Sequence, residues 1–380
     1  MDVYLDNATT TRVDGRVLDS MTEYFVEQYG APTTEYGHSW GTAALEALED
    51  SRSTIANQLG VSAEEVVFTS GGVESNNMAI QGIARSAGEG KIITSQIEHS
   101  SILETVKYLE RVGFEVEALP VDPTGVIEPE SLARALDDDS ILVALGHSNG
   151  EIGTIQDVEE ISRICRDEGV PLHLDARYSF MWEPLDLGTL NVTTTSVTSH
   201  LIHGPKGIGA LINSGNIEME PLVHGPGREF GTVPGTPNVP GAVGMAKAIE
   251  IWREEDVHRI RALRDMLWTR IHEEFSDTEL NGPSENRLAS NLNVNFPGVE
   301  GESILLYLDM AGIAVSTGSA CSSKNLKPSY VLSATGRPPE RSHGSIRFSL
   351  SRFNDREQID YACEKLVEVV SKLQEMSSMR

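Results

Sequence analysis

Residues 66–77 read Val66-Val67-Phe68-Thr69-Ser70-Gly71-Gly72-Val73-Glu74-Ser75-Asn76-Asn77. The first four residues are apolar or β-branched, which is typical of a short buried strand. Two glycines follow, and the run after them is free of helix breakers, so a helix is predicted to begin near Val73. The stretch therefore predicts a strand, a tight turn and a helix, the unit from which sheets covered by helices are built.

Strand and helix patterns go on alternating along the chain. Further strands are predicted at residues 91–94, 114–119, 141–145, 171–174, 192–196 and 209–212. Further helices are predicted at residues 16–29, 40–59 and 157–168 and from about residue 101. This alternation predicts an α/β fold with a mostly parallel sheet covered on both faces. Ligands of such sheets bind at the carboxyl ends of the strands, so site residues are expected directly after strands.

The pattern changes beyond residue 245. One long helix is predicted over residues 245–275, and a final helix over 355–375. Strands are predicted between these helices at residues 290–296, 313–315 and 345–349. This order favours a smaller α+β domain that closes on the larger one. The expected bounds are 14–255 for the large domain, with 1–13 and 256–380 forming the small domain.

Composition excludes several classes of partner. The formal net charge is −27, and the acidic residues are spread along the chain, so neither nucleic acid nor an anionic membrane is an expected partner. No apolar stretch reaches the roughly 18 residues of a membrane span. The three cysteines are odd in number and widely spaced, which argues against a disulfide framework. Together with an N-terminus without a signal-peptide pattern, these features predict a cytoplasmic protein with reduced thiols.

Several side chains that could carry chemistry follow predicted strands. The glycines at 71 and 72 open a helix whose free N–H groups suit a phosphate, although glycines there are more often plain turn residues. His99 could stack on an aromatic ring or could be an ordinary hydrogen-bonded loop residue. Asp175 could pair with a protonated ring nitrogen or could cap the next helix. None of these residues decides the function alone.

A second group of candidates lies further along the chain. His200 and His203 have metal-ligand spacing, but no third ligand is adjacent, and a metal site is not favoured. Cys321 lies among small hydroxyl residues in the loop 316–323, outside any hydrophobic period, which indicates an exposed and reactive thiol. Cys165 and Cys363 lie in helical patterns and are assigned to packing. An arginine on a predicted apolar strand, at position 347, needs an anionic partner, either a substrate carboxylate or a buried acid.

In order and over essentially the whole chain, these segments resemble the cysteine desulfurases of the IscS/NifS kind, which depend on pyridoxal phosphate (PLP). The matching blocks are residues 4–10, 69–77, 98–99, 149–156, 173–176, 199–200, 204–207, 316–321 and 345–353. The resemblance implies the PLP-dependent transferase fold of type I. Its large domain would hold a mostly parallel seven-stranded sheet, and the small α+β domain would carry the Cys321 loop. It also implies a homodimer with the site near the subunit interface.

The resemblance assigns a cofactor set at matching positions. His99 corresponds to the histidine that stacks on the PLP ring, and Asp175 to the partner of the pyridinium nitrogen. Thr198 and His200 correspond to phosphate ligands, and Thr236 to a threonine that the second subunit offers.

Two further positions match residues that act on the substrate, and the glycine turn also has a counterpart in the family. Arg347 corresponds to the clamp for the carboxylate of the cysteine substrate. Cys321 corresponds to the nucleophile that takes the sulfur as a persulfide. Gly72 and Val73 lie where the family's phosphate turn lies.

Five positions depart from the family's pattern. Leu201 stands where the family has the lysine that forms an imine with PLP. Gly150 replaces an asparagine near the cofactor's phenolic oxygen, and Tyr178 replaces a glutamine. Val73 replaces a phosphate-binding threonine, and Ala31 replaces the asparagine of an early Asn-Pro pair. Leucine can neither form the imine nor move a proton, so PLP is predicted to be absent or bound without a covalent link, and PLP-dependent desulfurase activity is predicted to be absent.

No other lysine is a convincing substitute. The lysines are Lys91, Lys107, Lys206, Lys247, Lys324, Lys327, Lys365 and Lys372. Lys206 is nearest in sequence to the missing amine, but it lies across the turn at 204–205 and belongs to the matched scaffold motif. The cofactor-binding set is therefore expected to be vestigial.

The thiol loop keeps its motif while the cofactor positions do not. The leading hypothesis is a non-PLP partner in iron–sulfur cluster assembly that docks an IscU-like scaffold. Cys321 would be a ligand of a [2Fe-2S] cluster shared with the scaffold, or an acceptor of sulfur from another source such as free sulfide. The alternatives are an active PLP-dependent desulfurase that releases alanine and forms a Cys321 persulfide, and a structural or regulatory pseudoenzyme that does not use Cys321. Sulfur relay to transfer-RNA thiolation is a further alternative.

Overall fold

The central sheet has seven strands in the order β2-β8-β7-β6-β5-β3-β4 in a computed structural model that describes residues 1–34, 36–317, 328–338 and 342–378. The strands are β2 (Val66–Thr69), β3 (Lys91–Ser95), β4 (Glu115–Leu119), β5 (Ser140–Gly146), β6 (Leu172–Asp175), β7 (Thr194–Thr198) and β8 (Gly209–Ile212). Strand β8 runs antiparallel to both of its neighbours, and the other pairs are parallel. The predicted seven-stranded, mostly parallel sheet is confirmed.

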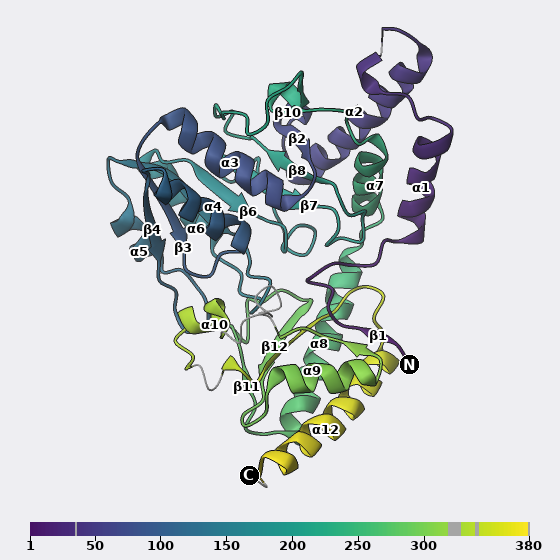
Figure 1. The fold of residues 1–380 in the computed structure, drawn as a ribbon, viewed down its shortest axis with the longest axis vertical. Coiled ribbons are helices and arrows are strands. Elements are labelled where there is room, and N and C mark those ends of the chain that lie inside the picture. Colours follow the sequence, from purple (N-terminus) through teal and green to yellow (C-terminus); the bar gives the residue numbers. More distant parts are fainter. Residues whose placement is uncertain (35, 318–327, 339–341, 379–380) are drawn as a thin grey trace.

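Helices cover both faces of this sheet (Figure 1). They are α1 (Gly15–Val26), α2 (Ser39–Leu59), α3 (Gly72–Ala87), α4 (Ser100–Arg111), α5 (Pro129–Ala135), α6 (Val158–Glu168) and α7 (Val239–Glu250). Successive residues of a strand point to opposite faces of the sheet and therefore pack against different helices. Ile92 and Leu142 belong to a core cluster with α3 and α4, whereas Ile93 and Val143 belong to a second cluster with α2, α6 and α7. Residues along these strands are apolar on both faces because both faces are covered.

A second unit contains a three-stranded antiparallel sheet in the order β11-β12-β14. Its elements are α8 (Glu254–Glu274), β11 (Glu279–Leu280), β12 (Asn291–Asn295), α9 (Gly301–Met310), β13 (Ile313–Ala314), α10 (Tyr330–Ala334), β14 (Ser345–Ser349) and α12 (Arg356–Ser378). Strand β1 (Val3–Tyr4) pairs in parallel with β13, so the N-terminus lies in this unit (Figure 1). The unit has a core cluster of its own, but the expected domain bounds stay a prediction.

Short elements complete the description. They are the 3-10 helices Pro32–Thr34, Ala63–Glu65 and Glu229–Gly231 and the antiparallel pair β9 (Gly227–Arg228) and β10 (Val233–Pro234). Among the described residues, no helix combines the length and the apolar run that a membrane crossing needs.

The single long helix predicted over residues 245–275 is wrong. Helix α7 ends at Glu250 and α8 begins at Glu254, and Arg253 between them has an extended backbone with φ −134° and ψ 129°. Trp252 lies in this break and packs against the core clusters of both units. The chain crosses here from one core to the other, and the helix is interrupted at this crossing. Periodicity alone does not reveal such a break, because residues 251–253 include no glycine or proline.

Truncation of a core side chain just before the site should destabilise the protein strongly. Leu174, on β6, is 1% exposed, and Leu306, on α9, is 62% exposed. Leu174→Ala should lower the free energy of unfolding by about 2–5 kcal/mol, through lost burial and a residual cavity. The matched change Leu306→Ala should alter it by no more than about 0.5 kcal/mol. Urea denaturation of both variants measures the difference, and equal effects would contradict the described core.

Candidate functional site

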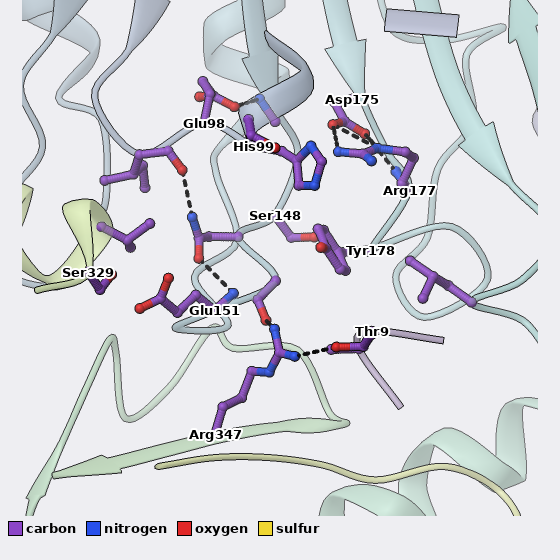
Figure 2. A pocket seen from close by; sticks show the side chains of 18 of the residues that line it. Thr9, Glu98, His99, Ser148, Glu151, Asp175, Arg177, Tyr178, Ser329 and Arg347 are labelled. Carbon is purple, nitrogen blue, oxygen red and sulfur yellow. Dashed lines mark hydrogen bonds and ion pairs between the residues drawn. The ribbon is translucent and has the colours of Figure 1, made fainter. Parts of the chain in front are cut away.

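A cavity of about 340 Å³ lies at the carboxyl ends of the central strands, between the large sheet and the second unit (Figure 2). Its walls come from the loops after β3, β5, β6 and β7, from the N-terminal segment, from the start of α10 and from β14. This is where a mostly parallel sheet is expected to hold its ligand, because the strand ends direct the loops to one edge. The position of the cavity therefore follows from the topology.

The structure brings most of the sequence-predicted site residues together. Seven of them line the cavity: Val73, His99, Asp175, Tyr178, His200, Leu201 and Arg347. Gly72 and Thr198 are buried close behind this wall. Thr236 is exposed and does not line the cavity of this chain. Cys321 lies outside the described residues.

Asp175 ends strand β6 and is bound by Arg177, a residue that the sequence analysis did not single out. The Arg177 Nε atom donates to Oδ1 at 2.7 Å and to Oδ2 at 3.0 Å, and Nη2 donates to Oδ2 at 2.6 Å. Both side chains are buried, at 4% and 7% exposure. An arginine two residues after a carboxylate at the end of a buried strand was the available signal, since a guanidinium fits a carboxylate bidentately.

This ion pair holds Asp175 ionised. Burial alone would raise the pKa of Asp175, but the charge and hydrogen bonds of Arg177 outweigh it and lower the pKa to about 2. Removing one partner of such a pair costs about 3–5 kcal/mol, because an uncompensated charge stays buried. Asp175 is therefore committed to a cation from its own chain.

Neutral polar groups connect the ion pair to the interior. Asn76 donates from Nδ2 to Asp175 Oδ2 at 3.0 Å and to Ser101 Oγ at 2.8 Å, and its Oδ1 lies 3.0 Å from His173 Nε2. His99 Nδ1 lies 2.9 Å from the same Ser101 hydroxyl. The pKa of His99 is lowered to about 4, first by burial and then by the charge of Arg177. His99 is thus neutral at pH 7, and its ring is held by this network.

Leu201 is 6% exposed and lies in the wall of the cavity. Its turn is fixed by the N-terminal segment, because Thr11 donates from both its backbone N and its Oγ1 to the carbonyl of His200. Of the described residues that line the cavity, none is a lysine. Lys206 is exposed on the surface and lies outside the cavity wall.

The start of α3, where a phosphate could bind, is partly used by the chain itself. The Glu74 carboxylate accepts from the backbone N of Ser70 at 2.5 Å, and Thr69 Oγ1 accepts from the backbone N of Gly71 at 3.3 Å. Within the described chain, the fully buried hydroxyl of Thr198 has no hydrogen-bond partner. His200 is neutral, because burial and the charges of Arg177 and Lys206 lower its pKa to about 4. An anion bound here could use the Thr198 hydroxyl, but it would have to compete with the Glu74 carboxylate for the N–H groups at the start of α3.

Arg347 reaches the cavity from β14 and is paired by groups of the same chain. Its Nη2 atom donates to Thr9 Oγ1 at 3.0 Å (Figure 2). Nη2 also donates to Asp6 Oδ1 at 2.8 Å, and Nη1 donates to the carbonyl of Gly150 at 3.2 Å. A carboxylate ligand at Arg347 would therefore have to compete with Asp6. Glu151 is buried nearby, and burial raises its pKa.

These residues do not fit PLP held in the manner of the family. An imine needs an amine, and the wall has the aliphatic Leu201 at the corresponding place. A pyridinium nitrogen needs a free carboxylate, and Asp175 is already engaged by Arg177. Cofactor chemistry is therefore not assigned to any residue of this cavity.

Glu98 offers a pH test of the cavity's electrostatics. Its pKa is raised to about 7, above the ordinary 4.5, mainly by burial and also by the charge of Asp175. The folded protein thus binds a proton that the unfolded chain has already lost, and this stabilisation disappears as the pH rises through about 7. Glu98 Oε1 faces Ser95 Oγ at 2.5 Å, and Oε2 accepts from the backbone N of Gly146 at 2.7 Å.

Glu98→Gln should remove this pH dependence, because a glutamine amide stays neutral over the whole range and its oxygen can still accept from the backbone N of Gly146. The free energy of unfolding of the wild-type protein should fall between pH 5 and pH 8 more steeply than that of the variant. Urea denaturation across this range measures the two slopes. Glu110→Gln, on the exposed end of α4, is the control and should keep the wild-type slope. Equal slopes in Glu98→Gln and the wild type would contradict the raised pKa.

Comparisons with known proteins agree with this architecture. The model of the class-V aminotransferase family matches residues 3–362. The chain is 42% identical over 381 residues to cysteine desulfurase IscS of Dictyoglomus turgidum, covering 99% of this chain and 96% of that protein. It is also 42% identical over 382 residues to cysteine desulfurase IscS 1 of Archaeoglobus fulgidus, covering 99% of each.

Solved structures with similar sequences have the same fold. A NifS-like protein superposes with a TM-score of 0.92 at 37% identity, over 98% of this chain and 100% of that one. The structure of SspA in complex with cysteine has a TM-score of 0.84 at 32% identity, over 93% of this chain and 100% of that one. The sheet order, the position of the cavity and these full-length similarities lead to one conclusion: the chain belongs to the class-V aminotransferase family, among its IscS/NifS cysteine desulfurases.

Proposed function

We propose that this protein is a desulfurase-like, cytoplasmic homodimer that serves iron–sulfur cluster assembly without covalently bound PLP. It docks an IscU-like scaffold and supplies Cys321 as a ligand of a [2Fe-2S] cluster or as an acceptor of sulfur. The observation that carries the proposal is the contrast within one cavity. Its cofactor wall has lost the amine and the free carboxylate, whereas the segments on either side of the thiol loop are fixed at the cavity.

The segment before Cys321 is held by Arg347. Ser316 and Arg347 form an antiparallel bridge, in which Arg347 N donates to the Ser316 carbonyl at 2.7 Å and Ser316 N donates to the Arg347 carbonyl at 3.2 Å. The residue that the resemblance assigns to substrate carboxylate binding is therefore tied directly to the start of the thiol loop.

The segment after Cys321 is held by α10. Ser329, Tyr330 and Val331 line the cavity, and the Tyr330 hydroxyl donates to the backbone carbonyl of Glu98 at 2.7 Å. The thiol loop is thus anchored at both ends to groups of the cavity wall. These anchors support a role for Cys321 at the cavity that does not require PLP.

Both roles of Cys321 are chemically complete without PLP. As a cluster ligand, the thiolate donates an electron pair to iron, and no redox step is required. Free sulfide cannot form a persulfide on Cys321 without a two-electron oxidant, so the sulfur donor must itself be a persulfide, and the thiolate attacks its outer sulfur. The S–S bond of the donor breaks and the donor leaves as a thiolate, so the transfer consumes no oxidant.

Cys321→Ser should abolish cluster formation on the scaffold. The purified protein, an IscU-like scaffold, ferrous iron, a persulfide donor and a one-electron reductant, which supplies the electrons that turn persulfide sulfur into sulfide, are mixed without oxygen. Cluster formation is followed by its visible absorbance and circular dichroism. Cys363→Ala is the control, because Cys363 is buried in α12 and should leave assembly unchanged. Unchanged assembly by Cys321→Ser would refute the role and favour a pseudoenzyme that binds its partner without this thiol.

The names of the relatives favour one competing function, an active PLP-dependent cysteine desulfurase. The absence of an amine at Leu201 predicts that cysteine with added PLP yields no alanine and no sulfide above the protein-free rate. The relative from Dictyoglomus turgidum, assayed in parallel, is the positive control. Stoichiometric or catalytic alanine release by this protein would instead support a working desulfurase.

A further inference from the structure

Arg177 and Tyr178, consecutive residues directly after β6, occupy the part of the cavity between Asp175 and Gly150 (Figure 2). We infer that this pair, here called the Arg177–Tyr178 plug, is a built-in replacement for a cofactor ring and excludes PLP even when an amine is restored at position 201. The inference concerns how the site is filled. It does not depend on the role of Cys321.

Arg177, the first residue of the plug, occupies most of the hydrogen-bonding capacity of the Asp175 carboxylate. The carboxylate accepts hydrogen bonds from Arg177 N, Nε and Nη2 and from Asn76 Nδ2, at 2.6 to 3.1 Å. A carboxylate has about four lone-pair sites, so these donors leave none for a ring N–H. A pyridinium could reach Asp175 only by displacing Arg177, which would leave a guanidinium buried without its partner.

The stem of Arg177 needs a glycine beneath it. A Cβ atom at Gly72, the first residue of α3, would lie 1.7 Å from Arg177 Cδ and 2.6 Å from its Cγ. No side chain fits there while Arg177 adopts its present position. The side chain of Arg177 thus runs across the start of α3, the place where the resemblance puts the cofactor's phosphate turn.

The ring of Tyr178 needs a second glycine. A Cβ atom at Gly150 would lie 2.3 Å from Tyr178 Cζ and within 2.6 Å of its Cε1 and Cε2. Gly150 and Tyr178 replace two larger or more polar family residues, and in space they are one coupled change. The asparagine that the family has at position 150 could not coexist with this ring, because core atoms at such separations overlap.

The two plug residues and His99 form one contiguous group. The Arg177 guanidinium carbon lies 5.7 Å from the centroid of the Tyr178 ring, and the His99 ring centroid lies 6.4 Å from that of Tyr178 at 58° between planes. His99 therefore faces a tyrosine of its own chain. Arg177 supplies a cation that pairs with Asp175, and Tyr178 supplies a ring that lies near His99. These are the interactions that a bound pyridinium ring would make.

The experiment restores the amine with and without the plug. Leu201→Lys alone is compared with Leu201→Lys/Arg177→Ala/Tyr178→Gln, each as the full chain incubated with PLP. Imine absorbance and intact mass after borohydride reduction report the fraction labelled. The triple variant should bind PLP about tenfold or more tightly than Leu201→Lys, since the carboxylate and the ring space become free. Leu201→Lys/Arg166→Ala, which changes an exposed arginine of α6, is the control and should match Leu201→Lys.

Folding of every variant is checked by near-ultraviolet circular dichroism and cooperative unfolding. If Arg177→Ala does not fold, Arg177→Gln takes its place, since it removes the charge but keeps part of the stem and an amide donor. Complete labelling of Leu201→Lys alone, or a folded triple variant that labels no better than it, would overturn the inference. The cluster assay with Cys321→Ser is independent of both outcomes, so failure of the plug and failure of the proposed function are distinguishable.

Discussion

The buried pairing of Asp175 with Arg177 is the constraint on which the rest of the site depends. Burial and, after it, the charge of Arg177 lower the pKa values of His99 and His200. The pairing also stabilises a carboxylate that would otherwise be unpaired at the bottom of a cavity. The site is therefore electrostatically complete within one chain. No group from outside the chain is needed to balance the charge of Asp175.

The fold was largely predictable from sequence, because short apolar strand patterns alternate with helical patterns along the chain. The alternation of strands and helices predicted a mostly parallel sheet covered on both faces, and the resemblance to the desulfurases implied its seven strands. The break between α7 and α8 was not predictable from periodicity, because it depends on Trp252 packing against two cores. Helix α9 was not predicted, because it has only ten residues and lies between segments with strand patterns.

The site was predictable only in part. Residues matched by the resemblance, such as His99 and Asp175, do line one cavity, because the topology brings their strand ends together. Leu201, Gly150 and Tyr178 could each be recognised as a departure, but not as parts of one arrangement. The spacing of Arg177 from Asp175 was a signal for their ion pair, but the fit of the Arg177 side chain over Gly72 is visible only in three dimensions. The positions of Cys321 and Thr236 relative to a partner subunit or scaffold remain predictions.

The close fit between Arg177 and Gly72, and between Tyr178 and Gly150, couples these four positions energetically. A side chain at Gly150 would overlap the ring of Tyr178, and loss of the Arg177 charge would leave Asp175 buried without its partner. Because each change alters the space or the charge that its neighbour meets, the effects of substitutions at these positions on the free energy of unfolding are expected to be non-additive.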